Sequence, residues 1–407
     1  MIACLRFFIS IESAAWYETT LCTFITVKVQ RRQIKRVEEQ EREIPFPVFT
    51  FGLDNFIVCG KQRFHGLTTE NVEVGSFCRR GFVTCPKQPI IFFNMCTILT
   101  ITFSPCIDKS FSIAELIPEK KLRGSIPKTE PGGGGINVAR VLARLGANAI
   151  ALYPSGGYTG KALDQLMAKE LIPVISVETQ NETRENIIVL ETSTNKQFRF
   201  TLPAPGLNEK ELEEIFGRIE EIRRLDFIVV SGSLPANISP NMFSEIDAIA
   251  RKKKAKVIVD TSGEALKHAV DQGVYLIKPN VSELAHLTGK EYLQADEIVE
   301  QAKNIIKTKN CEIIVVSLNA DGAMLVTNDK SIQIAPPAVN VKSTVGAGDS
   351  MVAGIVFALS GGEDIKTAVQ YGVACGTAAT LNAGTELCHK KDVELLFDQV
   401  RSLPEGL

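Results

Sequence analysis

The 407-residue sequence is poor in the residues from which protein metal centres are usually built. It contains four scattered histidines, and its ten cysteines form no Cys-x-x-Cys pair and no Cys/His cluster. Structural zinc sites draw their ligands from such closely spaced pairs, so the pattern argues against a zinc site. The cysteines are instead predicted to be free thiols, as is usual in intracellular proteins.

The sequence also lacks an excess of charge and an uninterrupted apolar run. Its formal net charge is −2, which gives no reason to expect a nucleic-acid or membrane-surface partner. The most apolar segment, residues 89–107, is interrupted by Asn94 and Pro105, and predicts a buried strand preceded by a linker rather than a membrane span. Glu12 interrupts the apolar patch at the N-terminus, and no clean signal-peptide cleavage site follows it. We therefore expect a cytoplasmic protein.

The composition of the chain changes near Met95. Residues 1–94 are poor in glycine and show no sustained hydrophobic period, so their role is not predicted. They are interpreted as an appendage, a targeting piece, or translated sequence upstream of the true start at Met95, and the last is favoured. Residues 95–407 have a regular pattern and are expected to form one domain.

Buried-strand patterns alternate with amphipathic helical patterns after Met95. The predicted strands cover residues 97–103, 147–154, 226–233, 256–263, 274–280 and 312–318. Between the first two, a predicted helix places Val138, Val141, Leu142 and Leu145 on one face. This alternation predicts the α/β class, with a mostly parallel sheet covered by helices on both faces. Such sheets bind their ligands at the carboxyl ends of the strands.

One segment departs from the alternation. Residues 185–203 read as two strands around the turn "TSTNK", with no helix between them. Together with residues 107–124, this hairpin is predicted to form a small sheet that covers the ligand edge. A plain surface hairpin is the alternative.

The stretch "STVGAGDSM" places a glycine loop directly before an apolar helix. It is not a Walker A loop, because no Gly-Lys-Ser/Thr follows, and Met351 stands where a dinucleotide fingerprint needs its third glycine. Backbone N–H groups at the start of a helix form an anion site that suits a phosphoryl group. Asp349 beside that anion is interpreted as a general base, or alternatively as an ordinary helix cap.

A second glycine loop, "EPGGGGINVAR", lets a ligand approach the backbone closely. Asn137 follows it in the first turn of the predicted helix, where its amide can meet sugar hydroxyls. A flexible turn without a ligand is the alternative interpretation.

The motifs "PGGGGINVARVLARLG", "SGSLP", "KPNVSE" and "STVGAGDSM" occur in one order along the chain. In this, the chain from about Cys96 resembles the PfkB (ribokinase-like) carbohydrate kinases, and within them the phosphofructokinase branch. The resemblance implies a ribokinase-like fold with a small β-sheet lid, a homodimer formed through that lid, and ATP-dependent phosphorylation of fructose 6-phosphate. Tagatose-6-phosphate kinase and 1-phosphofructokinase activities remain alternatives. A kinase of unphosphorylated sugars and a non-catalytic sugar-phosphate sensor are less favoured.

The resemblance also implies a role for each matching position. Asp349 is the expected catalytic base, and Gly346, Ala347 and Gly348 form the expected anion hole. The positions expected to hold the sugar phosphate are Asp108, Lys121, Gly133, Asn137, Arg184 and Ser233. Those expected to hold ATP, with Mg²⁺ reached from Glu283 through water, are Lys278, Asn280, Glu283, Ser317 and Gly322.

A potassium site beside the anion hole is implied as well. Its expected positions, most of which would contribute main-chain carbonyls, are Ser343, Val345, Ala379, Asn382, Gly384 and Glu386. The chain departs from the pattern of the phosphofructokinase branch twice. Asn319 stands where a glycine is expected near ATP, and Glu386 stands where an arginine is expected, which inverts the local charge.

Overall fold

The computed structural model describes residues 96–239, 242–309 and 311–403. It also describes four short strands nearer the N-terminus: β1 (Ile9–Ser10), β2 (Thr26–Val27), β3 (Ser76–Cys78) and β4 (Gly81–Val83). The chain divides into two compact units, Met1–Phe92 and Phe93–Leu407. The second unit carries the fold discussed below, and the interpretations of residues 1–94 fall almost entirely outside the described residues.

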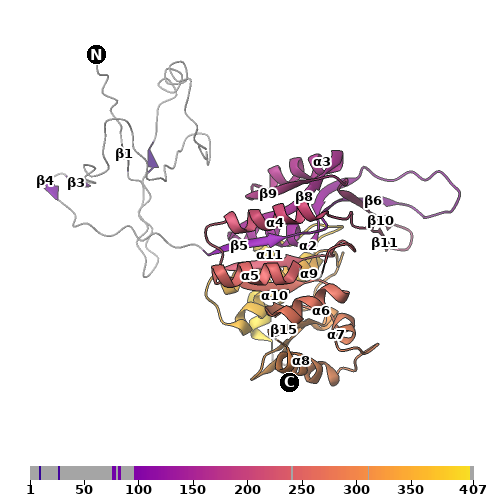
Figure 1. Cartoon of the computed structure of the whole chain (residues 1–407). Helices are drawn as coiled ribbons and strands as arrows, with labels where there is room; N and C mark the ends of the chain where they lie inside the picture. The colour runs from indigo at the N-terminus through magenta and orange to yellow at the C-terminus, as the bar shows by residue number, and fades with distance from the viewer. Residues whose placement is uncertain are drawn as a thin grey trace, which may run out of the picture. The chain divides into compact units, whose positions relative to one another are not determined.

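A nine-stranded sheet forms the centre of the second unit (Figure 1). Its order is β17-β16-β15-β14-β13-β12-β5-β8-β9. Strands from β15 to β9 in this order run parallel, whereas β16 and β17 are antiparallel. The bounds are β5 (Thr97–Ile101), β8 (Asn148–Gly156), β9 (Val174–Thr179), β12 (Phe227–Ser231), β13 (Lys256–Asp260), β14 (Val274–Ile277), β15 (Cys311–Ser317), β16 (Ala323–Val326) and β17 (Ser331–Ile334). The predicted parallel sheet is confirmed.

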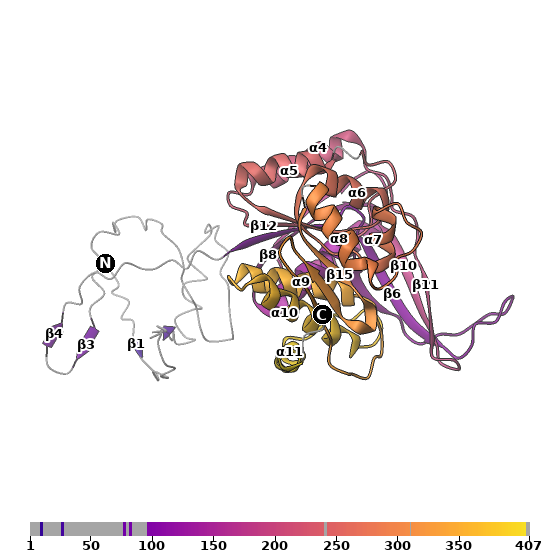
Figure 2. The ribbon, with the colours of Figure 1, turned by 90° about the horizontal axis from the view of Figure 1, so that it is seen from below.

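Helices cover both faces of this sheet (Figure 2). One face packs against α2 (Gly134–Leu145), α9 (Ala347–Ser360), α10 (Ile365–Thr380) and α11 (Lys390–Ser402). The other packs against α4 (Glu209–Glu221), α5 (Met242–Lys253), α6 (Gly263–Gln272), α7 (Val281–Leu287) and α8 (Glu297–Thr308). Strands such as β12, buried at every position, read as continuous Val/Ile runs because helices cover both sides.

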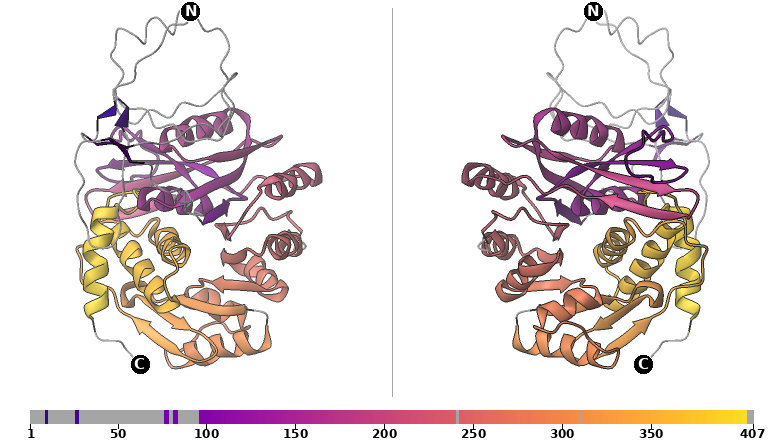
Figure 3. Two further views of the ribbon diagram at one scale, coloured as in Figure 1. Left: turned by 90° about the vertical axis from the view of Figure 1, so that its left-hand side faces the viewer. Right: turned by 90° about the vertical axis from the view of Figure 1, so that its right-hand side faces the viewer.

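Helix α2 follows its hydrophobic pattern closely. The four apolar residues predicted to share one face are all buried, and they pack against α9 and the sheet. Gly146 ends the helix in the left-handed conformation, with φ 99°, which glycine adopts without a steric penalty. Figure 3 shows the early purple segments and the yellow C-terminal helices side by side. The packing of α2 on α9 brings the two glycine loops to one place.

A second, four-stranded sheet, called here the small sheet, has the order β11-β10-β6-β7. Its strands are β6 (Cys106–Ile113), β7 (Lys128–Gly132), β10 (Arg184–Glu191) and β11 (Lys196–Phe200), and α3 (Gly157–Met167) with a short 3-10 turn (Ala168–Glu170) packs nearby. The predicted hairpin is confirmed as β10 and β11. The prediction for residues 107–124 was only partly right, because the strand ends at Ile113. Residues 114–127 form a loop that projects from the body in Figure 1.

Two other expectations can be compared with the described residues. Among them, no helix is long and apolar enough to cross a bilayer. The strand predicted in the most apolar segment is β5, which is buried from Ile98 to Ile101, while residues 89–95 lie outside the described part. The five cysteines from Cys96 onward are free, as predicted.

Candidate active site

The loop before α9 is shaped by Gly346, which caps the helix. Its φ of 75° lies in the left-handed region, and a Cβ at this position would come within 2.6 Å of Leu387 Cδ2. Only glycine satisfies both constraints without strain. The first N–H groups of a helix have no partner within the helix. The Gly348 N–H therefore has no partner within the helix, whereas the Ala347 N–H lies 3.4 Å from the Thr344 carbonyl oxygen, and the anion hole at this loop stays a prediction.

Asp349 lies in the first turn of α9 and is half-buried. Its Oδ2 accepts a hydrogen bond from Asn137 Nδ2 at 2.8 Å, across the junction with α2. Burial, together with the negative charges of Asp260 and Asp108, raises the pKa of Asp349 to about 6, although Asn137 and Lys278 oppose the shift. The cap of the helix is Gly346, so Asp349 is left to face the site. A carboxylate with a pKa near neutrality suits a general base.

The second glycine loop packs against the ends of β5 and β12. Gly133 has φ 109°, and a Cβ on Gly134 would lie 2.4 Å from Ser231 Oγ. A Cβ on Gly135 would lie 2.5 Å from the carbonyl oxygen of Ile101. The run of glycines is therefore required by close backbone approach, and it brings Asn137 to Asp349.

Arg184 crosses from the small sheet to the loops of the large sheet. Its Nη1 donates to the Leu202 carbonyl at 2.7 Å, and its Nη2 donates to the Ser104 carbonyl at 3.2 Å and to Ser233 Oγ at 3.3 Å. Its Nε is buried without a partner among the described residues. The structure thus brings Arg184 and Ser233 together, as the sequence predicted.

Two more predicted sugar-site residues lie in very different surroundings. Asp108 is buried on β6, near enough to Asp349 to raise that residue's pKa. Lys121 is exposed on the projecting loop 114–127 and is not brought to the other predicted residues. Its expected role at the substrate phosphate therefore stays a prediction, because within this subunit no strand carries residue 121 toward the site.

Lys278, which follows β14, lies at the junction with the anion site. Its Nζ forms an ion pair with Asp260 Oδ1 at 3.1 Å and lies 3.6 Å from the position that a Cβ on Gly348 would occupy. Burial lowers the pKa of Lys278, but Asp260, Glu283 and Asp349 raise it, and the net shift is upward. Lys278 therefore stays charged beside the anion site. Asp260 was not predicted from the sequence as a site residue, although its position at the end of β13 was a signal for it.

Asn280 and Glu283 form a capping box at the start of α7. The Asn280 side chain accepts from the Glu283 N–H at 2.8 Å, and Glu283 Oε2 accepts from the Asn280 N–H at 2.9 Å. Burial raises the pKa of Glu283, opposed by the Asn280 N–H and Lys278. The Asn-x-x-Glu spacing thus has a structural role. One oxygen of Glu283 is not used by the box.

The backbone conformation of Asn319 explains why asparagine can stand where the family pattern has glycine. Asn319 has φ 55°, so the position expected to be glycine does adopt the left-handed conformation, which asparagine tolerates better than most residues. Gly322 has φ 84°, and a Cβ there would lie 2.1 Å from the Ile334 carbonyl oxygen. Ser317 donates its N–H to the Pro279 carbonyl at 2.8 Å. These residues fix the turn beside Asn280.

The segments expected to hold potassium meet beside the anion loop. Ser343 Oγ donates to the Gly384 carbonyl at 2.7 Å and accepts from the Val345 N–H at 3.2 Å. Glu386 pairs with Lys128 at 3.1 Å and with His389 at 2.9 Å. The charge inversion at Glu386 is therefore neutralised locally, by a lysine on β7. The remaining expected positions, Ala379 and Asn382, lie at the end of α10 and just after it.

Arg199, on β11, was not predicted from the sequence as a site residue. Its side chain lies on the same face of the small sheet as Ile188, its cross-strand neighbour on β10. Arg199 Nη2 donates to Thr344 Oγ1 at 3.3 Å, two residues before Gly346. The period-2 alternation of "KQFRF" was the signal that places Arg199 on the inner face.

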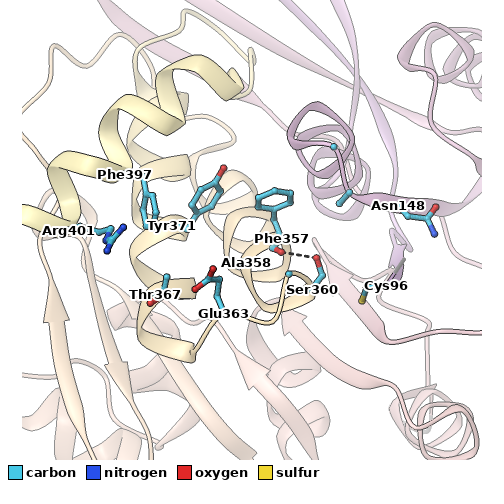
Figure 4. A pocket seen from close by; sticks show the side chains of 13 residues that line it. Cys96, Asn148, Phe357, Ala358, Ser360, Glu363, Thr367, Tyr371, Phe397 and Arg401 are labelled. Carbon is cyan, nitrogen blue, oxygen red and sulfur yellow. Dashed lines mark hydrogen bonds between the residues drawn. The ribbon is translucent and has the colours of Figure 1, made fainter. Parts of the chain in front are cut away.

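Asp349 lines neither of two cavities that lie among the described residues. One, of about 490 Å³, is lined by Ser233 and Thr261 among others. The other, of about 670 Å³, lies where β5 and β8 begin, beyond the C-terminal end of α9 (Figure 4). Its wall includes the rings of Phe357, Tyr371 and Phe397, and none of the predicted site residues lines it.

Comparison with known proteins identifies the family. The profile of the pfkB family of carbohydrate kinases matches residues 101–392. The chain belongs to the pfkB family of carbohydrate kinases. The predicted ribokinase-like fold, with its small second sheet, is thereby confirmed.

Similar proteins within this kinase family are named for specific phosphofructokinase activities. The ATP-dependent 6-phosphofructokinase isozyme 2 of Escherichia coli (strain K12) is 40% identical over 304 residues, which cover 74% of this chain and 98% of that protein. The solved structure of Escherichia coli phosphofructokinase-2 in complex with fructose-6-phosphate has a TM-score of 0.71 at 39% identity, covering 75% of this chain and 100% of that one. The 1-phosphofructokinase of Borreliella burgdorferi is 30% identical over 75% of this chain and 97% of that protein.

Proposed function

We propose that this pfkB-family kinase transfers the γ-phosphoryl group of ATP to the C1 hydroxyl of fructose 6-phosphate. The observation that carries the proposal is Asp349, hydrogen-bonded to Asn137 and half-buried beside a glycine-lined helix N-terminus. The higher identity to 6-phosphofructokinase isozyme 2 than to 1-phosphofructokinase favours this substrate. A 29% identical D-tagatose-1-phosphate kinase marks the second candidate class.

In the proposed reaction, the N–H groups of Ala347 and Gly348 bind the transferring phosphoryl group. The sugar hydroxyl attacks phosphorus, its proton passes to Asp349, and the bond to the ADP oxygen breaks. Lys278, held by Asp260, neutralises charge on the same phosphate oxygens. Backbone donors fixed by the glycine conformation need no rearrangement during transfer.

Arg184 and Arg199 are proposed to bind the 6-phosphate of the sugar. Arg184 lies against Ser104 and Ser233, and Arg199 reaches Thr344, so the two guanidinium groups approach the site from the small sheet. Guanidinium groups bind phosphate oxygens in bidentate fashion. Asp108, Gly133 and Asn137 are proposed to contact the sugar itself.

Divalent and monovalent cations are proposed to assist. Among the described residues, no group of three or more His, Cys, Asp or Glu side chains forms a metal cage. Magnesium would be held mainly by the ATP phosphates and water, with Glu283 as the protein's contribution through its free oxygen. Potassium would bind the carbonyl groups of the segments 343–345 and 379–386. A potassium complex is known for Escherichia coli phosphofructokinase-2.

The two faces of the small sheet support a homodimer. One face carries Asp108, Arg184 and Asn186 toward the site, while Ile187, Phe198 and Phe200 on the other are 40%, 38% and 50% exposed. Exposed apolar patches of this kind commonly mark interaction surfaces. We propose that two small sheets pair through this apolar face, each acting as a lid over its own sugar.

The projecting loop fits the same arrangement. Leu122 and Ile126, which both follow the turn at residues 118–120, are 38% and 93% exposed. Lys121 on this loop is therefore proposed to complete the sugar-phosphate site of the partner. The substrates point to the cytoplasm as the place of action, since ATP and sugar phosphates are produced there.

A coupled assay of ADP release over a panel of acceptors tests the function. The panel contains fructose 6-phosphate, tagatose 6-phosphate, fructose 1-phosphate, tagatose 1-phosphate, fructose and ribose. We expect the highest kcat/KM with fructose 6-phosphate and little turnover of the two unphosphorylated sugars. Equal turnover of ribose would show that Arg184 and Arg199 bind no substrate phosphate.

A further inference from the structure

Asp108 has two partners on the small sheet that the proposed mechanism does not use. Asn186 on β10 stands opposite Asp108 on β6 in the parallel register. Asn186 Nδ2 donates to Asp108 Oδ1 at 2.9 Å, and Cys106 Sγ donates to the same oxygen at 3.3 Å. Asn186 Nδ2 also lies 3.1 Å from Cys106 Sγ. The three side chains therefore form a closed triangle beneath the proposed sugar site.

The two carboxylate oxygens of Asp108 have different surroundings. Both hydrogen bonds reach Oδ1, whereas Oδ2 lies over Gly132, only 2.4 Å from where a Cβ on that residue would stand. Gly132 begins the glycine loop that is proposed to hold the sugar. Oδ2 is thus turned toward the ligand side, with its acceptor capacity unused by these partners.

The protonation of Cys106 supports its role as a donor. The thiol is buried, and burial together with the Asp108 carboxylate raises the pKa of Cys106 well above its ordinary value. The thiol therefore keeps its proton at neutral pH and donates a hydrogen bond to Oδ1. A neutral donor in this place adds no charge that would compete with the sugar's own hydroxyl groups.

Asn186 is fixed by its amide nitrogen rather than by both ends of the side chain. Its Oδ1 is buried and has no hydrogen-bond partner among the residues that the structure describes. Leaving a buried polar atom unpaired costs about 1–3 kcal/mol. A side chain that only filled space at this position would not have to leave a buried oxygen unpaired. Its contact with Asp108 is the interaction that offsets it.

We propose that Asn186 and Cys106 are positioning residues for the sugar: they occupy Oδ1 of Asp108 and thereby aim Oδ2 at a sugar hydroxyl. The inference rests on the proposed function, since a sugar phosphate is the ligand. Neither residue touches the reacting atoms. Without Asn186, the Asp108 carboxylate can rotate between two orientations. Only one of them directs Oδ2 toward the sugar hydroxyl.

Three variants test this by comparing the change in KM for fructose 6-phosphate with the change in KM for ATP. Loss of one hydrogen bond to a charged group corresponds to roughly a tenfold to hundredfold change. Asn186→Ala should raise KM for fructose 6-phosphate at least about tenfold, and KM for ATP less than about twofold. Cys106→Ala should raise the same sugar KM by a few fold, and Cys106→Ser, which keeps a donor, should restore it. Equal changes in both KM values, or no difference between the two Cys106 variants, would overturn the proposal.

A second measurement separates this inference from the substrate assignment. In crystal structures without ligand, Asn186→Ala should show the Asp108 carboxylate rotated away from Gly132, relative to the wild-type protein. An unchanged carboxylate overturns the inference whatever the substrate is. If the acceptor panel identifies another sugar, the proposed substrate is wrong, and the three variants are then measured with that sugar.

Discussion

The proposed nucleotide half and the proposed sugar half of this site, called below the nucleotide half and the sugar half, differ in how their polar groups are paired. In the nucleotide half, Lys278 pairs with Asp260, and Asn280 with Glu283. In the sugar half, most of the buried polar atoms without a partner among the described residues gather at the ends of β5 and β12 and on β10, namely Thr102 Oγ1, Ser104 Oγ, Ser231 Oγ, Arg184 Nε and Asn186 Oδ1. Two further such atoms lie outside the sugar half, Thr261 Oγ1 just after β13 and Ser350 Oγ on α9.

The difference indicates which half has its polar groups paired before a ligand binds. Paired groups in the nucleotide half hold the phosphate-binding geometry through the protein's own contacts. Unpaired groups in the sugar half have a cost that a polar ligand with many hydroxyls can remove. We infer that the transfer machinery is preorganised, while the unpaired polar groups of the sugar half find their partners when the sugar binds.

The largest effect is expected at the boundary between the halves. Asp349→Asn removes the proton acceptor while keeping the hydrogen-bonding shape, so kcat should fall by about 10²–10⁴-fold. Affinity for ATP, measured by titration calorimetry, should stay within about twofold. Asp398→Asn, on the exposed side of α11, is the matched control and should be indistinguishable from the wild type. Near-normal turnover of Asp349→Asn would mean that the base lies elsewhere.

In the nucleotide half, Lys278→Ala should destabilise the fold. It leaves the carboxylate of Asp260 without its buried partner, which typically costs about 3–5 kcal/mol. Urea unfolding followed by circular dichroism measures this loss. Lys252→Ala, which breaks an exposed pair with Glu220, should change stability by less than about 1 kcal/mol. Equal effects of the two variants would contradict the idea of a preorganised half.

In the sugar half, Arg184→Ala should act on binding rather than on folding. Loss of a charged contact to the sugar phosphate should raise KM for fructose 6-phosphate about ten- to a hundredfold, with KM for ATP nearly unchanged. Arg218→Ala, an exposed position on α4, serves as the control for steady-state kinetics. A parallel rise in KM for ATP would show that the halves are not separate.

The smallest effect concerns the apolar face of the small sheet. Phe200→Glu places a charge in the proposed dimer interface, and sedimentation velocity should show a shift toward monomer with a dimer Kd weakened about tenfold or more. Leu395→Glu, at a residue 58% exposed on α11, should leave the assembly unchanged. A dimer that survives Phe200→Glu intact would place the interface on another surface.

Much of the fold followed from local pattern. The Val/Ile runs of the large sheet and the buried face of α2 were predicted because each is a property of consecutive residues. Strand β7 was missed, since "KTEPG" contains proline and glycine, which normally mark loops. Pro131 is tolerated there because β7 is the edge strand of the small sheet.

Site residues that belong to a sequence motif were predictable. Site residues that are defined by their tertiary partners were less predictable. Both glycine loops and Asp349 were selected from the sequence. The ion pair of Lys278 with Asp260 depends on the register of neighbouring strands, and the neutralisation of Glu386 depends on the unpredicted β7. Lys121 was placed with Arg184 by resemblance, although within one subunit a projecting loop keeps it away.

The pH dependence of kcat tests the central claim most directly. If Asp349 accepts the proton, only its ionised form is active, and its pKa of about 6 sets the acid limb. With saturating ATP and fructose 6-phosphate, kcat should fall about tenfold per pH unit below pH 6, and the residual activity of Asp349→Asn should lack that limb. A wild-type kcat that stays constant down to pH 5, or an identical limb in Asp349→Asn, would contradict the account.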